Sequence, residues 1–392
     1  MTEAPEVSSP PASQSSVLAG MRYGQGPALT VGVEEEYMIL DGETLELTSR
    51  IKQVQDAVAE EPWGDRVMQE LTESCVEVAT DVCPTVDDAY RDLSQIRSGL
   101  WRRLEPLGLQ FGSAGTHPYS KSEDQRISSH DRYRELVDQL QYLARREIVF
   151  GMHIHVAIPD ADTAIQVMEG VLVELPVLLA LSCNSPFWRG KPTGIASTRT
   201  AVFAGFPRSG LPPQFRSYEE YAEGVHLMER TGVIKDYTRL WWDVRPHPRL
   251  GTLEVRVCDA QFDVHYALAL VAFVQALVKE VLEEIEAGKP PSTYHRMHVA
   301  ENMWLAARYG VEAELMDLCG GGHERLSVRS LVRRRLPLLE PHARELGCWD
   351  ALQGVERILS DGTGAARQLR VYNANHDLYE LMVELAEYSS RT

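Results

Sequence analysis

Apolar residues up to Asp259 follow two repeating patterns, one of strand length and one of helix length. Short runs rich in β-branched and apolar residues, bounded by turn residues, are typical of strands. Apolar positions three and four residues apart are typical of amphipathic helices. The first pattern predicts strands over 30–40, 70–80, 107–114, 151–159 and 251–259. The second predicts helices over 48–60, 85–104, 131–145 and 163–183.

After Asp263 the helical pattern continues almost without interruption, over 265–287, 292–309, 324–346, 348–360 and 374–390. Residues 184–220 are rich in Pro, Gly and Arg and have little periodicity, which indicates a long functional loop system. Strands mixed with helices, followed by helices alone, predict an α+β fold. We expect the main part of a catalytic domain over 21–264, and a helical C-terminal part over 265–392 packed on the same unit.

Two segments could be mistaken for targeting or membrane signals. Residues 1–20 are rich in Ser, Pro, Ala and Glu and lack a basic start followed by an apolar run, so we expect a disordered tail and no signal peptide. The apolar run Ile165–Cys183 contains Glu169, Glu174 and Pro176, which would be costly or disruptive in a bilayer. It therefore predicts a buried helix.

Composition narrows the class of protein. Of the 392 residues, 44% are hydrophobic and 24% are charged, as in ordinary globular proteins. The net charge of −18 argues against unaided binding to nucleic acid or to anionic lipid, because both require a basic face. Six cysteines without a CxxC pair indicate reduced thiols in a cytoplasmic protein. We therefore expect small-molecule partners, and the oligomeric state, including a homo-oligomer, stays open.

Carboxylates recur on two predicted strands. In VGVEEEY, alternation places Glu34 and Glu36 on one face and Glu35 on the other, unless the segment is only a solvated acidic edge. In ELTESCVEVATD (70–81), Glu73 and Glu77 share a face, and Glu70 joins Glu77 only if a bulge or turn intervenes. The pattern does not decide whether Glu70 or Glu73 accompanies Glu77.

Two further predicted strands contain imidazole and guanidinium groups. GMHIHV places His153 and His155 on one face, where they could bind a metal or could be ordinary core or surface histidines. TLEVRVCD alternates Glu254, Arg256 and Cys258 against three apolar residues, and the acid and guanidinium could equally form a plain ion pair. Taken together, oxygen-rich groups with one or two imidazoles favour Mg²⁺ or Mn²⁺ over structural zinc.

VGVEEEYMILD (31–41), GMHIHV (151–156) and TLEVRVCDA (252–260), in this order, resemble the type 2 glutamate–cysteine ligases, also called carboxylate–amine ligases. The likeness runs from about residue 30 to 385 and includes GTHP (115–118), NSPFWRGKPTG (184–194), WWDVRPHPRLG (241–251) and ENMWLAARYG (301–310). The three strand motifs are also similar to glutamine synthetase. This resemblance implies a curved antiparallel sheet flanked by helices, with metals held between the sheet and ATP.

The resemblance also implies roles, residue by residue. Metal at the ATP phosphates would be held by Glu34, His153 and Glu254, and metal nearer the transferred phosphoryl group by Glu36, Glu70 and Glu77. Arg256 would face phosphate or substrate, and His155 would contact phosphate. Arg199, Arg208 and Arg245 would bind ATP or anionic groups of the substrate, unless they form surface ion pairs.

The expected activity is that of an ATP- and Mg²⁺- (or Mn²⁺-) dependent carboxylate–amine ligase with glutamate–cysteine ligase activity, through a γ-glutamyl phosphate. The sequence contains no GxxxxGK[ST] loop, which fits ATP binding on a metal-lined sheet. Two alternatives remain: a ligase of the same mechanism for another carboxylate and amine, and a non-catalytic protein that binds metal or nucleotide.

Overall fold

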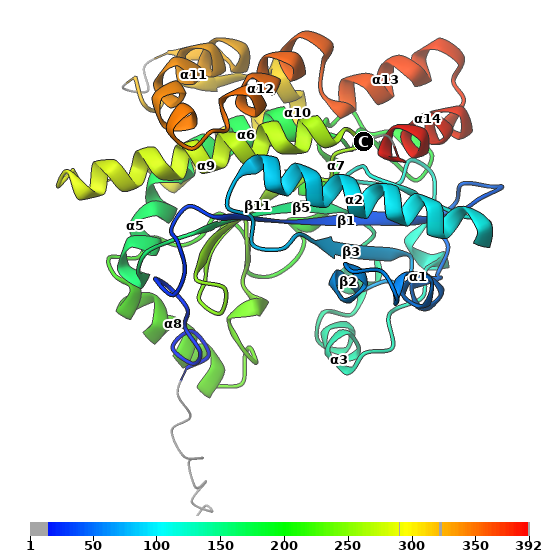
Figure 1. The fold of residues 1–392 in the computed structure, drawn as a ribbon, viewed down its shortest axis with the longest axis horizontal. Coiled ribbons are helices and arrows are strands. Elements are labelled where there is room, and N and C mark those ends of the chain that lie inside the picture. The colour runs from blue at the N-terminus through cyan, green and yellow to red at the C-terminus, as the bar shows by residue number, and fades with distance from the viewer. Residues whose placement is uncertain (1–14, 290, 321–323, 391–392) are drawn as a thin grey trace, which may run out of the picture.

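One antiparallel sheet organises the molecule (Figure 1). The computed structural model describes residues 15–289, 291–320 and 324–390. The central strand β1 (Val31–Asp41) pairs with β5 (Gly151–Ala157) on one side and with β3 (Cys75–Ala79) and β4 (Leu109–Gly112) on the other. The sheet continues through β11 (Thr252–Asp259) to β10 (Val244–His247) beyond β5, and through β2 (Val67–Gln69) beyond β3.

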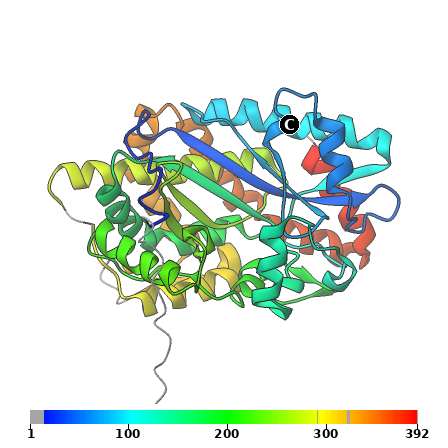
Figure 2. The same cartoon turned by 90° about the horizontal axis from the view of Figure 1, so that it is seen from below.

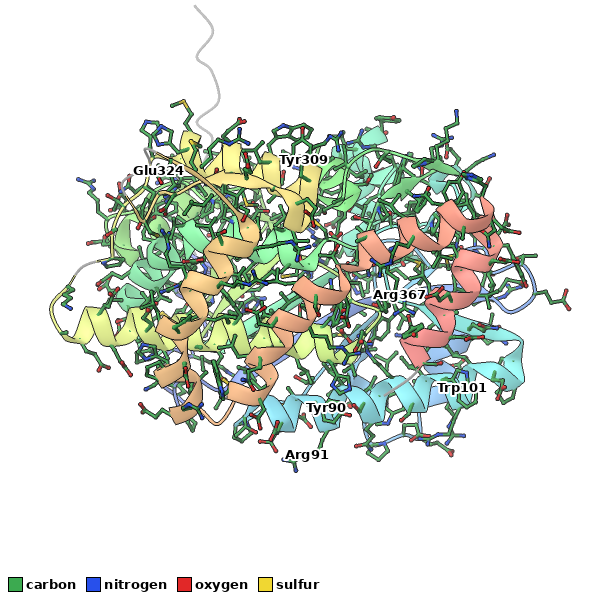
Figure 3. All side chains as sticks on the ribbon, turned by 90° about the horizontal axis from the view of Figure 1, so that it is seen from above. Tyr90, Arg91, Trp101, Tyr309, Glu324 and Arg367 are labelled. Atoms are coloured by element: carbon green, nitrogen blue, oxygen red, sulfur yellow. The ribbon has the colours of Figure 1, made fainter. Side chains whose placement is uncertain are left out.

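One face of this sheet is covered by helices. The layer contains α2 (Val86–Leu104), α5 (Ala161–Val171), α6 (Leu175–Ser182) and the long α9 (Val264–Glu286). Figure 3 views the layer from outside, with Tyr90, Arg91 and Trp101 marking α2 along one edge. Because α2 and α9 both pack on the sheet and on each other, the main hydrophobic core lies between sheet and helices.

The C-terminal part adds a second layer of helices outside the first. Helices α11 (Val328–Glu345) and α12 (Trp349–Asp361) pack on α9, and α10 (Arg296–Tyr309) packs on α6. Helix α13 (Gly364–Asn375) leads into α14 (Leu378–Ser390), which packs on β4. The predicted α+β fold with a helical C-terminal part is confirmed.

The opposite face, which we call the cavity face, is enclosed by shorter helices and loops (Figure 2). Helix α1 (Ile51–Val58) is not one of them, because it packs on α2 and shares a core with Tyr37 and Ile39. The helices on the cavity face are α3 (Asp131–Leu140), α7 (Thr198–Phe203) and α8 (Tyr218–Arg230). Two of them correct the expectation for 184–220, because α7 lies within that loop system and α8 begins in it. Strand β10 was also not expected.

Several predicted boundaries shift where the backbone turns. The helix expected over 131–145 ends at Leu140 and resumes as α4 (Tyr142–Arg145), because Gln141 has a φ of +50°. The helix expected over 374–390 is α14 alone, and the left-handed His376 separates it from α13. The start of the helix expected over 324–346 is instead strand β13 (Arg325–Ser327), paired with β12 (Glu314–Met316).

The predicted tail 1–20 is not uniform. Its residues 1–14 lie outside the described residues, whereas residues 15–20 have a defined place. Val17 is fully buried, and the Ser15 hydroxyl donates to the Glu229 carboxylate at 2.9 Å. The Ser16 N–H also donates to the Glu229 carboxylate, at 3.2 Å, so the segment that starts at Ser15 contacts α8 through one apolar side chain and two hydrogen bonds.

Two helical stretches, Ala161–Ser182 and Val264–Glu286, are long and apolar enough to cross a membrane by length and composition. Their most apolar windows are 83% and 89% buried inside the protein. The first contains the run predicted to be a buried helix, and that prediction is confirmed. The apolar side chains of both stretches are part of the hydrophobic core between the sheet and the outer helices.

The middle acid of VGVEEEY anchors the sheet to its helix layer. Glu35 points away from Glu34 and Glu36, as predicted, and forms an ion pair with Arg97 of α2 at 2.6 Å, with both side chains fully buried. Arg97 also donates to the backbone carbonyls of Gln261 and Phe262 at 2.8 and 3.0 Å, and the Tyr37 hydroxyl donates to Glu35. One guanidinium thus ties β1, α2 and the segment after β11 together.

Replacing this guanidinium should cost much stability. We expect Arg97→Ala to lower the free energy of unfolding by about 3–5 kcal/mol, because the Glu35 carboxylate would stay buried without its partner. Chemical denaturation measures the loss. Lys52→Ala serves as the control, because Lys52 pairs with Asp56 at the surface, and should change stability by less than about 0.5 kcal/mol. Equal losses for the two variants would contradict the anchoring role.

Candidate functional site

The predicted site residues of four strands converge on the cavity face. Strand alternation sends Val31, Val33, Glu35 and Tyr37 toward the helices and leaves Glu34 and Glu36 on the other side. The antiparallel register then places Glu34 opposite His153, Glu36 opposite Glu77, and His155 opposite Glu254. All of these except His155 line one cavity of about 310 Å³.

Glu34 is the centre of the first group of potential metal ligands. Its two oxygens lie 3.0 Å from His153 Nδ1 and 3.4 Å from His155 Nε2. Ligand atoms of Glu34, Glu77 and His153 all lie within 4.8 Å of one another, as do those of Glu34, His155 and Glu254. These two sets overlap at Glu34, so neighbouring cations could share its carboxylate.

The protonation of the two imidazoles differs. Burial lowers the pKa of His153 to about 4, and the positive charge of Arg256 acts in the same direction. This imidazole is therefore neutral at physiological pH, as a metal ligand must be. Burial also disfavours charge on His155, but the adjacent Glu34 carboxylate outweighs it and raises the pKa of His155.

Three carboxylates, those of Glu36, Glu70 and Glu77, form the second group and place one oxygen each within 4.8 Å of the others. Burial, followed by the charge of Glu70, raises the pKa of Glu36 to about 7. Burial and the charges of Glu34 and Glu70 raise the pKa of Glu77 well above its usual value. Like charges held this close favour a divalent cation, and an all-carboxylate set suits Mg²⁺ or Mn²⁺.

The structure places Glu70, and not Glu73, beside Glu77. Strand β3 begins only at Cys75, so the alternation expected over 70–80 does not extend back to either residue. Glu70 accepts from its neighbour Leu71 N at 2.9 Å and from the Tyr133 hydroxyl at 3.3 Å, which turns its carboxylate into the cavity. Glu73 pairs with Arg126 at 2.9 Å on the outside.

Glu254 is held by two guanidiniums. Arg245 Nε donates to Glu254 Oε2 at 2.6 Å and Nη2 donates to Oε1 at 3.1 Å, while Arg256 Nη1 pairs with Oε1. Although burial opposes ionisation, the charges of Arg245 and Arg256 keep the pKa of Glu254 well below its usual value. The ion pair between Glu254 and Arg256, one of the two interpretations that the sequence allowed, is therefore present. The Glu254 carboxylate also belongs to a potential metal-binding set, and it orients Arg245 and Arg256.

A β-bulge changes the end of this strand. The register with β5 shifts between Val255 and Cys258, so the regular alternation breaks there. Arg256 still faces the cavity, whereas Cys258 lies in the hydrophobic core with Val257. The expectation that Cys258 shares the face of Glu254 is therefore wrong.

Of the two remaining predicted arginines, Arg199 lies in the cavity and Arg208 lies outside its lining. Arg199 lines the cavity, where its Nη2 and Nη1 donate to the carbonyls of Arg256 at 3.1 Å and Val257 at 3.3 Å. Arg208 is not among the residues that line this cavity, and its Nε donates to the Arg239 carbonyl at 3.0 Å. Its guanidinium lies 5.2 Å from the centre of the Trp241 ring, on which it packs.

Other charged residues of the cavity were not expected from the sequence. Burial, followed by the charge of Glu36, raises the pKa of Glu147 to about 8, and its Oε2 has no hydrogen-bond partner among the described residues. Arg132 and Tyr133 reach the cavity from the first turn of α3. Glu147 stands four residues before GMHIHV, and this closeness to a strand motif is the one signal that could have indicated it.

A second cavity of about 470 Å³ adjoins the first along β1 and β5, with Glu34 and His155 in its lining. Its other walls are mostly backbone and apolar groups, among them Gly24, Gly32 and Gly251. Such a surface suits a flat, weakly polar group whose charged end reaches Glu34 and His155.

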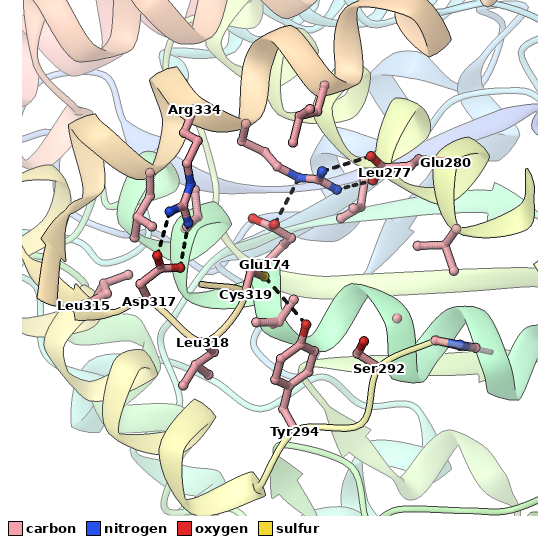
Figure 4. A pocket seen from close by; sticks show the side chains of 18 of the residues that line it. Glu174, Leu277, Glu280, Ser292, Tyr294, Leu315, Asp317, Leu318, Cys319 and Arg334 are labelled. Atoms are coloured by element: carbon pink, nitrogen blue, oxygen red, sulfur yellow. Dashed lines mark hydrogen bonds and ion pairs between the residues drawn. The ribbon is translucent and has the colours of Figure 1, made fainter. Parts of the chain in front are cut away.

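A third cavity, of about 250 Å³, lies apart from the sheet between α9 and α11 (Figure 4). Arg334 pairs with Asp317 at 2.6 Å, and Arg335 pairs with Glu174 at 3.0 Å and with Glu280. Arg334 and Arg335 are thus paired with three acidic side chains, and these contacts make the cavity a structural ion-pair cluster.

Comparison with known proteins gives consistent matches. The sequence model of Glutamate-cysteine ligase family 2 (GCS2) matches residues 30–384. A Rubrobacter xylanophilus protein with the provisional name glutamate–cysteine ligase 2-1 is 41% identical over 360 residues, covering 91% of this chain and 94% of that protein. A Herpetosiphon aurantiacus protein, provisionally named glutamate–cysteine ligase 2, is 38% identical over 356 residues, which cover 91% of this chain and 92% of that protein.

Two solved structures share the fold. A Francisella tularensis glutamate–cysteine ligase in complex with AMP has a TM-score of 0.66 at 14% identity and covers 92% of this chain and 88% of its own. A bifunctional glutathione synthetase from Pasteurella multocida has a TM-score of 0.65 at 16% identity, with 92% of this chain and 52% of its own covered. The expected ligase fold is therefore confirmed.

The carboxylate group predicts how stability depends on pH. Because the pKa of Glu36 is about 7 here against 4.5 ordinarily, the folded protein binds this proton more tightly than the unfolded chain does. Without divalent cations, its contribution to stability is fully present below about pH 4.5 and is lost as the pH rises through about 7. Melting temperatures in EDTA between pH 5 and 8 should fall less steeply for Glu36→Gln than for the wild type, and Mn²⁺ should reverse the wild-type fall.

Glu73→Gln is the matched control, since Glu73 lies outside the group and pairs with Arg126. It should leave the slope of melting temperature against pH unchanged. If Glu36→Gln and Glu73→Gln have equal slopes, the proposed repulsion within the group is wrong.

Proposed function

We propose that this chain, which belongs to glutamate–cysteine ligase family 2, uses ATP to activate the γ-carboxylate of glutamate and joins it to an amine. The observation that carries the proposal is the meeting of two groups of potential metal ligands with Arg199, Arg245 and Arg256 in one cavity. Phosphoryl transfer to a carboxylate needs such a combination, because charge develops on oxygens along the whole reaction path.

A carboxylate does not react directly with an amine, since an oxide is a poor leaving group. Transfer of the γ-phosphoryl group of ATP to a carboxylate oxygen gives an acyl phosphate and ADP. The neutral amine then attacks the acyl carbon, the C–N bond forms, and phosphate leaves with the electrons of the C–O bond. The nitrogen loses one proton, to the departing phosphate or to solvent, and the product is an amide.

The carboxylates and imidazoles provide the metal sites of this reaction. At the nucleotide phosphates, Mg²⁺ or Mn²⁺ would be held by Glu34, either with Glu77 and His153 or with His155 and Glu254, so the set expected from the sequence is divided between two groups. Nearer the carboxylate, it would be held by Glu36, Glu70 and Glu77. Bound cations would supply positive charge to phosphoryl oxygens. The raised pKa of Glu77 and Glu36 fits this assignment, because a cation replaces the protons that these buried groups would otherwise retain.

The arginines divide into two roles. Arg199 Nε and Arg256 Nε are buried donors without an acceptor among the described residues, so each can donate to an oxygen of the acyl phosphate or the substrate. Arg245 is already paired with Glu254 through both of its donors on that side, so we assign it to positioning Glu254. We assign Arg208 to packing on Trp241 and not to cofactor binding.

ATP would extend from the second cavity into the first. The adenosine would occupy the cavity of about 470 Å³, and the phosphates would pass Glu34 and His155 into the carboxylate-lined space. The AMP in the Francisella tularensis structure supports nucleotide binding on this fold. The free thiols of all six cysteines fit a cytoplasmic enzyme.

Hydroxylamine trapping tests the proposal directly. Protein incubated with ATP, Mg²⁺, glutamate and hydroxylamine should release ADP and form glutamyl hydroxamate, because this small nucleophile captures an acyl phosphate without a specific amine site. Excess EDTA should abolish both products. If a folded protein forms neither product, or forms them fully in EDTA, the proposed function is wrong.

Arg256→Lys should reduce turnover in the trapping assay at least ten-fold. An ammonium keeps the charge but cannot hold Glu254 and donate to a ligand oxygen at once, as a guanidinium can. Arg216→Lys, which changes an exposed arginine paired with Glu220, should have no effect. Melting temperatures must accompany the rates, because a folded Arg256→Lys protein with normal turnover would remove Arg256 from the mechanism.

A further inference from the structure

An apolar cavity of about 350 Å³ lies beside the site just described. It shares Arg199, Phe203, Trp241 and Arg256 with the carboxylate-lined cavity, so the two spaces adjoin across these four side chains. Its own walls are Leu211, Trp242, Met303, Trp304 and Ala307, together with small residues of α7. Its size falls within the range of small-molecule sites, about 300–1,000 Å³.

Nothing in the metal or nucleotide assignments uses this space. It lies at the end of β11 that carries Arg256, whereas the cavity assigned to adenosine lies at Thr252, the other end of the same strand. A ligand in the apolar cavity would therefore approach the reacting carboxylate from the side opposite ATP.

One acidic side chain lines this apolar cavity. Asp243 precedes β10, and its backbone is fixed on both sides: its N–H donates to Gly210 O at 2.8 Å, and its carbonyl accepts from Arg256 N at 2.8 Å. Within the described ranges of the chain, the Asp243 carboxylate has no hydrogen bond or ion pair, and the residue is partly exposed. Burial raises its pKa to about 6 against the opposing charges of Arg199 and Arg256, so it is mostly ionised at neutral pH.

A partly buried carboxylate that has no protein partner, at the wall of an apolar cavity, can accept from a donor on a ligand. The rest of the ligand must be apolar, because the cavity wall is formed by aliphatic and ring surfaces that offer no hydrogen bonds apart from an indole N–H. These surfaces belong to Leu211, Met303, Trp304 and Ala307. A primary ammonium on an apolar group has both properties.

We propose that the amine substrate is a primary amine with an apolar, ring-sized group; this inference rests on the proposed function. The binding site of this amine is the cavity lined by Asp243, Leu211, Met303 and Trp304. The Asp243 carboxylate pairs with the ammonium and accepts one of its protons, which frees the nitrogen lone pair for attack on the acyl phosphate. The apolar group packs on Trp304 and Met303 of α10. Cysteine, whose side chain is small, fills this space poorly.

The test compares amines within one protein. Initial rates with ATP, Mg²⁺ and glutamate are measured for phenethylamine, cysteine and hydroxylamine. We expect kcat/KM for phenethylamine to exceed that for cysteine at least ten-fold, mainly through a lower KM. Equal values, or a preference for cysteine, overturn the inference.

Two variants localise the effect. The readout is kcat/KM for phenethylamine divided by kcat/KM for hydroxylamine. Ala300→Trp, at the rim of the cavity, should lower this ratio at least ten-fold because the indole fills the space. Asp243→Asn, inside the cavity, should lower it at least ten-fold because the charge is removed. Glu301→Trp is the matched control, since Glu301 is an exposed neighbour on α10 outside the cavity lining and should leave the ratio unchanged.

The outcomes separate the two proposals. If the wild type forms no glutamyl hydroxamate, the ligase function itself is wrong. If hydroxamate forms but Ala300→Trp and Asp243→Asn keep the wild-type ratio, the ligase function stands and the apolar amine site is wrong.

Discussion

Repulsion among carboxylates on the cavity face is the constraint to which the rest of the structure responds. Glu36, Glu70 and Glu77 lie within ligand distance of one another, and Glu34 stands next to them with Glu254 beyond. Glu34, Glu36, Glu77 and Glu254 cannot move apart, because backbone hydrogen bonds pair β1 with β3 and β5, and pair β5 with β11 at Glu254. Such an arrangement is unfavourable by itself and becomes favourable when cations are bound.

The charges already present relieve only part of this repulsion. Arg245 and Arg256 neutralise Glu254, and His153 and His155 partner Glu34, so both of these carboxylates have a lowered pKa. Among the residues that the structure describes, no comparable partner reaches the other carboxylates, and the pKa values of Glu36, Glu70 and Glu77 are raised instead. The face thus contains one part whose charge is balanced by the protein and one part whose charge is left for a ligand.

Strand β1 shows how neighbouring residues acquire opposite functions. Glu34 and Glu36 face the cavity, while Glu35 between them is neutralised by Arg97 inside the helix layer. The ion pair holds the sheet against α2, and that rigid support keeps Glu34 and Glu36 at fixed positions. A less firmly held sheet would let the carboxylates separate, and the potential metal ligands would no longer lie within ligand distance of one another.

The sequence by itself determined the helix layer, most strands and the face on which Glu34, Glu36, His153, Glu254 and Arg256 lie, because strand alternation is a local property that a few residues specify. Its motifs also sufficed for the family. Tertiary structure decided what depends on contacts between distant segments. The turn before β3 selected Glu70 over Glu73, the bulge in β11 sent Cys258 into the core, and pairing of β10 with β11 bound Arg245 to Glu254. The apolar cavity beside Asp243 forms where α7, α10 and residues 241–243 meet, and no local sequence pattern could predict contacts between segments so far apart in the chain.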